Sequence, residues 1–197
     1  MHGIPIEGER VVLRDLTISD WPVIQEYARD PNVTRLILPS PQTPEQTKAF
    51  VQRAVARSLE EPRQWYELAI VQKIDARLIG DCRISIENFT YQQGSMGCFL
   101  RPEVWNLGFS TEVCGLMLRF GFERLGLHRM WAACDAENRP SGRSLERNGM
   151  RREATFRESV LRQDGFFHDT EVYAILKDEW TQRTHHLRGL ALETVSN

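Results

Sequence analysis

Residues 95–125 combine patterns that require a strand, a loop and a long helix in immediate succession. Residues 95–100 form a short, mostly apolar run of strand length, and Gly108 stands in the loop behind it. Apolar residues then recur at i, i+3, i+4 and i+7, the spacing of one helix face. These residues are Val113, Leu116, Met117 and Phe120. We therefore expect this helix to lie with its apolar stripe against a sheet.

The rest of the chain predicts a mixed α/β (α+β) domain. The expected strands are residues 10–13, 65–72, 78–86, 95–100, 128–133, 152–161 and 170–176. The expected helices begin at Ser19 or Asp20, near Thr43, at Thr111 and at Pro140, and end near residues 28, 59, 125 and 148. The first two helices are separated by a Pro-rich loop, residues 38–44. The order β-α-α-β-β-β-α-β-α-β-β lacks the regular β-α-β alternation of a doubly wound fold.

Charge and composition exclude several classes of protein. A formal net charge of −2 over 197 residues gives no electrostatic footprint for nucleic acid, which argues against a helix-turn-helix regulator. No apolar run approaches the ~20 residues needed to cross a bilayer. The first residues do not resemble a signal peptide, so we expect a cytoplasmic protein that binds neither nucleic acid nor membrane. The four cysteines form no CxxC pair and read as reduced thiols, with no metal site.

The loop before the predicted helix has the properties of an anion site. Gly108 allows close approach to the backbone, and Ser110 and Thr111 are residue types that cap helix starts. The unpaired N–H groups and the dipole of a helix start suit a diphosphate. A plain strand-to-helix turn is the alternative. The sequence contains neither GxxxxGK[ST] nor GxGxxG, which leaves coenzyme A as the common ligand with a diphosphate.

Four blocks, in order along the chain, resemble the GNAT superfamily of N-acetyltransferases. Residues 100–112 (LRPEVWNLGFSTE) are similar to the coenzyme A signature of its RimJ/RimL branch, of the type P-E-x-W-G-x-G-[YF]-[AS]-T-E. Residues 126–130 (GLHRM), residues 138–150 (NRPSGRSLERNGM) and the segment from Asp164 to Ile175 resemble three later blocks of that branch. The resemblance covers roughly residues 8–180, and we expect residues 181–197 to be a polar tail outside the domain.

The resemblance implies a single domain with a mostly antiparallel sheet that is splayed in the middle and flanked by helices. It implies that acetyl-CoA is the co-substrate, with its pantetheine arm in the splay. The residues expected to bind the coenzyme are Phe99, Leu100, Asn106, Leu107, Gly108, Phe109, Ser110, Thr111, Asn138 and Arg143. Arg143 and Arg147 lie one turn apart on the same helix face. They would bind the ribose phosphate of the coenzyme, or they would simply be solvated.

The matched positions also imply two catalytic residues. Asn138 would position the pantetheine arm or acetyl group, and a helix cap is its alternative role. Ser141 would bond the coenzyme sulfur and protonate the leaving thiolate, or face solvent. Tyr173 is a substitute acid or a core residue. The sequence departs from the branch at three positions: Asn106 replaces a usual glycine, Ser95 a frequent Glu, and Cys98 a frequent Tyr.

The acceptor is expected to be a primary amine, either a protein N-terminus or a small molecule, that attacks acetyl-CoA directly. An α-amine of pKa ~8 needs less help from a base than a lysine amine of pKa ~10.4. Asp81, Glu87 and Asp169 are candidate bases, although each is also a plausible surface or strand-end charge.

The acceptor would enter over the loop of residues 32–43 and the hairpin of residues 158–169. That hairpin carries Phe166 and Phe167, which would line the substrate mouth, contact a second copy in a homodimer, or pack within the hairpin. A non-catalytic acyl-CoA sensor with the same fold is the alternative function, because Ser95 and Cys98 depart from the branch.

Overall fold

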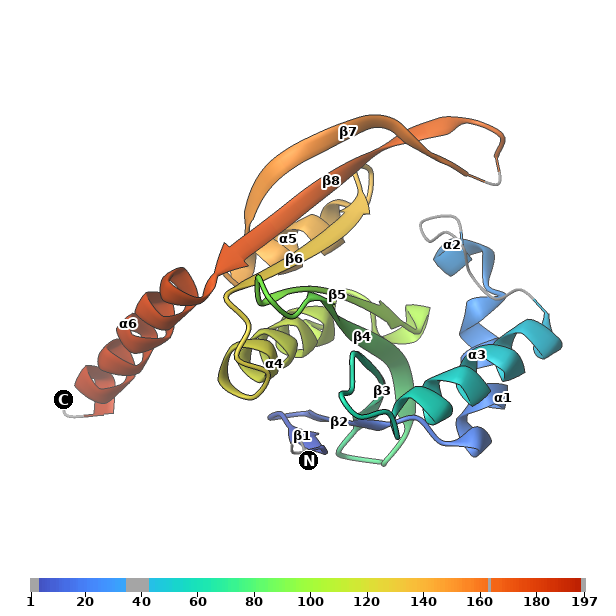
Figure 1. Ribbon diagram of the computed structural model, residues 1–197, viewed down its shortest axis with the longest axis horizontal. Coiled ribbons are helices and arrows are strands. Elements are labelled where there is room, and N and C mark those ends of the chain that lie inside the picture. Colours follow the sequence, from blue (N-terminus) through green and yellow to red (C-terminus); the bar gives the residue numbers. More distant parts are fainter. Residues whose placement is uncertain (1–3, 35–42, 163, 196–197) are drawn as a thin grey trace.

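Eight strands form one mixed sheet in the computed structural model, which describes residues 4–34, 43–162 and 164–195 (Figure 1). The strands are β1 (Ile6–Glu7), β2 (Val11–Asp15), β3 (Trp65–Gln72), β4 (Leu78–Asn88), β5 (Gln93–Leu100), β6 (Arg129–Asp135), β7 (Arg151–Leu161) and β8 (Phe167–Leu176). Their spatial order is β1-β2-β3-β4-β5-β6-β8-β7. Within the described chain only β5 and β6 pair in parallel, so the fold is the mixed, mostly antiparallel α/β sheet that was predicted.

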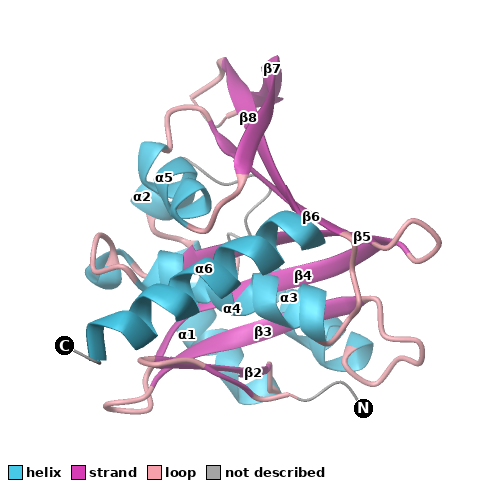
Figure 2. Cartoon of the chain, turned by 90° about the vertical axis from the view of Figure 1, so that its left-hand side faces the viewer, coloured by secondary structure: helices cyan, strands magenta, loops and turns pink. Residues whose placement is uncertain are grey.

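Helices cover both faces of the sheet (Figure 2). They are α1 (Trp21–Ala28), α2 (Pro31–Thr34), α3 (Pro44–Arg57), α4 (Phe109–Glu123), α5 (Arg139–Arg147) and α6 (Lys177–Val195), with short 3₁₀ turns at Ile18–Asp20 and Pro102–Val104. Successive residues of β3 point to opposite faces and belong to different cores. Leu68 and Ile70 pack in the larger core with α4, whereas Ala69 and Val71 pack with α1 and α3.

Helix α4 is the central element of the larger core. The predicted stripe of Val113, Leu116, Met117 and Phe120 is buried, as expected. Cys114, Leu118 and Phe122 are buried as well, because α4 lies between the sheet and the helices α5 and α6.

The caps of two helices show where local sequence signals succeed and where they fail. Helix α3 starts where it was predicted, and the structure identifies its cap, which the sequence leaves open: the Thr43 hydroxyl accepts a hydrogen bond from the Gln46 N–H at 3.2 Å. The start of α4 was placed too late at Thr111. The N-cap is Gly108 and the helix begins at Phe109, so Ser110 and Thr111 lie inside the first turn. The left-handed backbone of Gly108 turns the chain into the helix two residues before the capping-type side chains.

The structure contains several elements that were not predicted from the sequence. Strand β1 and the one-turn helix α2 are too short to leave a periodic pattern, and most of the predicted Pro-rich loop lies outside the described residues. Helix α6 runs through the boundary at residue 180 that we expect to separate domain and tail, and it projects away from the sheet in Figure 1. The described helices include none long and apolar enough to cross a membrane.

Candidate active site

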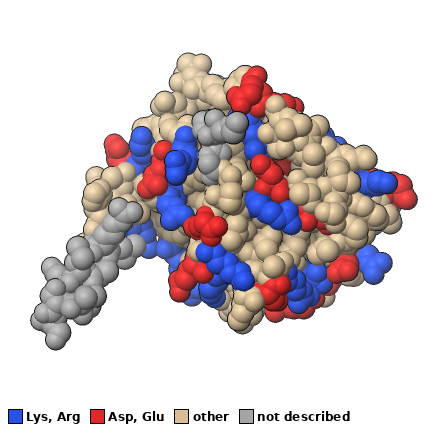
Figure 3. Space-filling model, turned by 90° about the horizontal axis from the view of Figure 1, so that it is seen from below, with Lys and Arg blue, Asp and Glu red and all other residues tan. Residues whose placement is uncertain are grey.

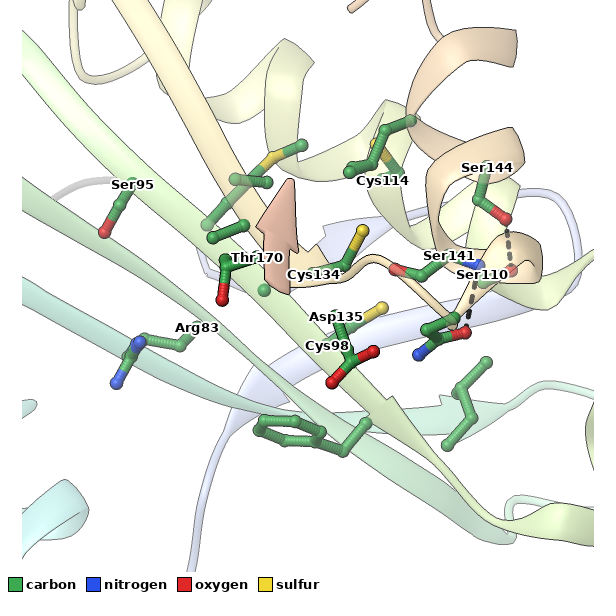
Figure 4. Close-up of a pocket in the computed structure, with 18 of the residues that line it drawn as sticks. Arg83, Ser95, Cys98, Ser110, Cys114, Cys134, Asp135, Ser141, Ser144 and Thr170 are labelled. Atoms are coloured by element: carbon green, nitrogen blue, oxygen red, sulfur yellow. Dashed lines mark hydrogen bonds between the residues drawn. The ribbon is translucent and has the colours of Figure 1, made fainter. Parts of the chain in front are cut away.

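Strands β5 and β6 separate in the middle of the sheet. They pair only where residues 93–95 meet residues 129–131. Beyond Ser95, β5 stays with β4 as far as Leu100, while β6 stays with β8 as far as Asp135. A cavity of about 400 Å³ fills the wedge between them and is lined by β5, β6, α4 and α5 (Figure 4). The predicted splay is therefore present at the predicted strands.

Successive residues of β5 direct their main-chain N–H and C=O groups alternately to β4 and to the gap that holds the cavity. The Arg101 N–H donates to the Ile79 carbonyl of β4 at 2.9 Å, and every second residue of an antiparallel strand faces the same neighbour. Phe99 therefore turns its backbone to β4, whereas Cys98 and Leu100 turn theirs to the gap. The Leu100 carbonyl accepts from the Trp105 indole N–H at 2.8 Å. Of the expected pair Phe99 and Leu100, the backbone of Leu100 therefore faces the gap and that of Phe99 does not, although Phe99 lines the cavity.

Two left-handed residues shape the loop before α4. Gly108 has φ +83° and Asn106 has φ +60°. Asparagine is among the few residues that adopt this region readily, so the replacement of the usual glycine at Asn106 keeps the turn. Asn106 and Leu107 are exposed, whereas the Phe109 side chain is buried. The first N–H groups of the 15-residue helix α4 follow this turn, and with the helix dipole they give this helix start the properties that an anion site requires.

An interaction between distant parts of the chain holds that loop in place. The Glu112 carboxylate accepts hydrogen bonds from the backbone N–H and the Nε–H of Arg10, both at 2.8 Å. Arg10 also donates to the Leu107 carbonyl at 2.9 Å and lies over the Phe109 ring at 4.4 Å. Arg10 is not among the residues predicted from the sequence, because no local spacing signals a contact across 102 residues.

Helix α5 lies beside the start of α4 and carries the two predicted catalytic residues. The Ser110 and Ser144 hydroxyl groups are 2.8 Å apart and join the two helices (Figure 4). Asn138 is the N-cap of α5 and accepts from the Ser141 N–H at 3.3 Å, so its alternative capping role is present. Both Asn138 and Ser141 also line the cavity.

Other predicted residues lie further from the cavity. Arg143 is exposed on α5, as its solvated alternative requires. Thr111 lies at 3.4 Å from the Ser144 hydroxyl and is half-buried. Tyr173 is not part of the cavity wall: it is buried, and its hydroxyl donates to Glu171 at 2.7 Å. Burial is the main cause that raises the pKa of Tyr173 far above its usual value. This agrees with the alternative that Tyr173 is a core residue and not an acid of the site.

The cysteines around the cavity are free thiols. Burial raises the pKa of Cys98 to about 12 and that of Cys134 to about 11, although a hydrogen bond with Ser141 partly lowers the latter. Thiols with such pKa values are protonated near neutral pH and are poor nucleophiles. Among the described residues, no three His, Cys, Asp or Glu side chains gather as a metal site.

The three candidate bases have different surroundings. Asp81 is buried and accepts a 2.5 Å hydrogen bond from the Tyr27 hydroxyl. Asp169 accepts from the Glu158 N–H at 2.8 Å on the β7–β8 hairpin. Glu87 accepts hydrogen bonds from Ser85 and Ser95, and Ser95 lines the cavity. Of these three candidates, only Glu87 is hydrogen-bonded to a side chain that lines the cavity, that of Ser95.

The charged surface agrees with the near-neutral composition. On the face shown in Figure 3, basic and acidic side chains lie interspersed. At the cavity itself, Arg162 pairs with Asp135 and also with Glu137, so this guanidinium is neutralised by its neighbours. A splayed strand pair whose main chain faces the gap, next to a helix start, is the class of site that suits an amide-bearing arm ending in a diphosphate.

Comparisons with known proteins identify that class. Residues 10–151 match the family described as "Acetyltransferase (GNAT) domain". The Uncharacterized N-acetyltransferase YnaD of Bacillus subtilis (strain 168) is 30% identical over 175 residues, which cover 89% of this chain and 98% of YnaD. A GNAT-family acetyltransferase from Bacillus anthracis has a TM-score of 0.77 at 28% identity, with 89% of this chain and 99% of that chain covered.

A more distant structure shares the fold alone. Mycobacterium smegmatis RimJ in complex with CoA-disulfide has a TM-score of 0.75 at 18% identity, covering 86% of this chain and 83% of RimJ. The family match and YnaD together show that the chain belongs to the GNAT acetyltransferases. It is accordingly an acetyl-CoA-dependent N-acetyltransferase, as predicted.

Proposed function

We propose that this enzyme is a RimJ/RimL-like acetyltransferase that transfers the acetyl group directly to a primary amine in a ternary complex. The observation that carries this proposal is one continuous cavity. It runs from Ser110 and Ser144 at the start of α4 to Ser95 and Arg83 on the strands (Figure 4). A coenzyme at the helix start and an amine at the other end would therefore meet inside it.

The state of the cysteines supports direct transfer. A two-step route would need a nucleophile that takes the acetyl group first. Cys98, Cys114 and Cys134 line the cavity, and burial raises the pKa of each above its usual value. Protonated thiols leave the acceptor amine as the nucleophile that attacks the thioester.

The residues at the coenzyme end have complementary proposed roles. Residues 106–111 would hold the diphosphate with backbone N–H groups, and the main chain of Cys98 and Leu100 would bind the pantetheine amides. When bound, acetyl-CoA supplies an activated acyl group on a thiolate leaving group. Asn138 would orient the arm with its amide N–H groups. The Ser141 hydroxyl would give a proton to the leaving sulfur and regain one from solvent. Arg143 would contribute positive charge near the phosphates.

The branch assignment rests on the motif blocks at residues 100–112 and 138–150. The structure supports it locally, since Trp105 and Glu112 each make a hydrogen bond that shapes the loop and Gly108 has a left-handed backbone. We further propose that the acceptor approaches over the β7–β8 hairpin, because Val160 and Thr170 of that hairpin line the cavity. Phe166 and Phe167 on the same hairpin are exposed. We propose two roles for these side chains: they line the entrance for the substrate, or they contact a second copy of the chain in a homodimer.

The test is a panel of primary amines incubated with acetyl-CoA and the enzyme, followed by mass spectrometry. The panel contains peptides with free Ala or Ser N-termini, an aminoglycoside, a polyamine and single amino acids. We expect an increase in mass by one acetyl group on one chemical class of amine, together with release of free thiol. Binding of acetyl-CoA without acetylation of any amine would instead favour the non-catalytic sensor.

A further inference from the structure

Two buried serines on neighbouring strands donate hydrogen bonds to one exposed glutamate. The Ser85 hydroxyl of β4 donates to Glu87 Oε1 at 2.7 Å, and the Ser95 hydroxyl of β5 donates to the same oxygen at 2.5 Å. The two hydroxyl oxygens are 2.8 Å apart. Ser85 and Ser95 are directly opposite in the β4–β5 register, so the backbone fixes the group.

The group stands where the sheet begins to open. Ser95 is the last residue of β5 that pairs with β6, and it lines the cavity. Figure 4 places it at the end opposite to Ser110 and Ser144. Ser95 is therefore the polar side chain of this group that an amine at that end would meet.

The direction of the hydrogen bonds leaves Ser95 able to accept a proton. Both serine hydroxyl protons point to Glu87, because a carboxylate can only accept. The lone pairs of the Ser95 oxygen then remain for a donor in the cavity, and the N–H of an ammonium group is such a donor. The Glu87 carboxylate can therefore take up a proton from the cavity through Ser95, although Glu87 itself does not line the cavity.

Other carboxylates near the cavity are engaged elsewhere. Asp135 lines the cavity but forms an ion pair with Arg162. Asp81 is outside the cavity wall and is bonded to Tyr27.

The charged groups on the elements around Glu87 are mostly paired. Glu67 of β3 pairs with Arg57 of α3, and Arg129 of β6 pairs with Glu153 of β7. Arg83 of β4 lies on the same strand face and lines the cavity.

We propose that Ser95 and Glu87 form the route by which the acceptor ammonium loses its proton. The ammonium N–H gives its proton to the Ser95 oxygen while the Ser95 proton passes to Glu87, which becomes neutral. The nitrogen, now with a free lone pair, attacks the thioester carbonyl, and the C–S bond breaks. The coenzyme leaves as a thiolate that takes the proton of the Ser141 hydroxyl, and the amide nitrogen gives its second proton to solvent, from which Ser141 regains one. Glu87 later returns its proton to solvent. This inference rests on the proposed amine acetylation, and Glu87 acts in it as a positioning residue through Ser95.

The first test compares two amines of nearly the same size. Ethylamine is an ammonium ion at neutral pH, whereas 2,2,2-trifluoroethylamine is largely neutral because its fluorines withdraw electrons. We expect Glu87→Gln and Ser95→Ala to lower kcat/KM for ethylamine by at least about tenfold, and to shift its pH profile to higher pH. We expect the same variants to change kcat/KM for trifluoroethylamine by less than about twofold.

Two further variants act as controls. Ser95→Thr keeps a hydroxyl group and is expected to retain ethylamine acetylation, and Glu60→Gln removes an exposed carboxylate outside the site. An equal loss for both amines would show that Glu87 serves the structure only, and would overturn the inference while leaving the proposed function intact.

The second test needs no turnover, so it separates this inference from the proposed function. The carboxyl-carbon NMR signal of Glu87 is assigned by its disappearance in Glu87→Gln. In protein saturated with coenzyme A, we expect ethylamine to move this signal in the wild type and in Ser95→Thr, but not in Ser95→Ala. A signal that ethylamine leaves unchanged in the wild type contradicts the proton route.

Discussion

Asn106 and Gly108 determine the path of the main chain at the proposed phosphate site. Their positive φ angles turn the backbone so that α4 begins directly behind the exposed loop. The two positions differ in what they tolerate, because a side chain at φ +83° is strained whereas asparagine accepts φ +60° at little cost. Space is not the obstacle at Gly108, since the nearest atom to an added Cβ would be an Arg10 nitrogen at 3.4 Å.

We expect Gly108→Val to weaken coenzyme A binding by about tenfold or more. The left-handed conformation costs a non-glycine residue roughly 1–2 kcal/mol, and a β-branched residue relieves the strain by moving the loop. Asn106→Gly is the matched control, because glycine adopts the same conformation freely and should keep the affinity. Titration calorimetry with coenzyme A measures both variants. Unchanged affinity in Gly108→Val would place the phosphate site elsewhere.

Asp81 is a buried carboxyl that ties α1 to the sheet through Tyr27. Burial is the main cause that raises its pKa to about 6, although the hydrogen bond from Tyr27 opposes this shift. Between about pH 4 and pH 6 the folded protein therefore holds a proton on Asp81 that the unfolded chain has released. The folded state loses stability as the pH rises through this window, by at most roughly 3 kcal/mol, and the loss is complete above it.

We accordingly expect Asp81→Asn to remove this pH dependence. The amide oxygen can still accept from Tyr27, and the variant carries no charge to bury. Urea unfolding should show equal free energies of unfolding for variant and wild type near about pH 4, and a more stable variant near about pH 7. A constant difference between the two proteins across this range would refute the assignment of the shift to Asp81.

At the scale of elements, the site is assembled from the starts of two helices. Arg10 and Glu112 fix the start of α4 to β2, and Ser144 fixes α5 to the first turn of α4. Asn138 then combines an observed role and a proposed one, and the two use different atoms of its side chain. Its side-chain oxygen caps α5, while its amide N–H groups remain for the proposed contact with the coenzyme arm.

Replacement of Asn138 can separate these two functions. We expect Asn138→Asp to keep the stability of the protein, because aspartate caps helices as well as asparagine and its charge suits the helix start. It cannot donate an N–H, so kcat should fall by about tenfold if the amide positions the arm. Asn138→Ala should in addition lose about 1 kcal/mol of stability through the missing cap. An Asn138→Asp enzyme with full activity would leave Asn138 a cap only.

Sequence patterns predict those elements whose signals are local. The apolar stripe of α4 and the start of α3 near Thr43 follow from spacing within a few residues, and both are confirmed. The cap of α4 was misjudged because a glycine in the left-handed region can take the place of a capping side chain. The contact of Arg10 with Glu112 depends on how α4 packs beside the start of β2, and that of Ser85 with Ser95 on the β4–β5 register. No local window of the sequence contains either kind of information.

At the scale of the whole molecule, the opening between β5 and β6 divides one sheet into two parts that need separate support. The β2–β5 part has helices on both faces, whereas β6 and β8 contact α5 and share the larger core with α4, and β7 pairs with β8 at the edge. Packing between the first turn of α6 and α4 adds a contact across this division. The Trp180 ring lies 5.4 Å from the ring of the buried Phe122, and Glu179 accepts from the Leu176 N–H at 3.0 Å.

Truncation tests whether the domain ends near residue 180, as we predict. A chain that ends after residue 180 keeps Trp180 and loses the exposed hydrogen bond from Arg183 to the Arg147 carbonyl. Because exposed polar contacts contribute about 1 kcal/mol or less, we expect a small fall in stability and unchanged coenzyme A affinity. Trp180→Ala in the full chain should cost more, about 2–3 kcal/mol, since it removes a half-buried ring from the larger core. Urea unfolding of the two proteins decides between the alternatives. If truncation costs as much as Trp180→Ala, the later turns of α6 hold Trp180 on Phe122, and the helix belongs to the domain.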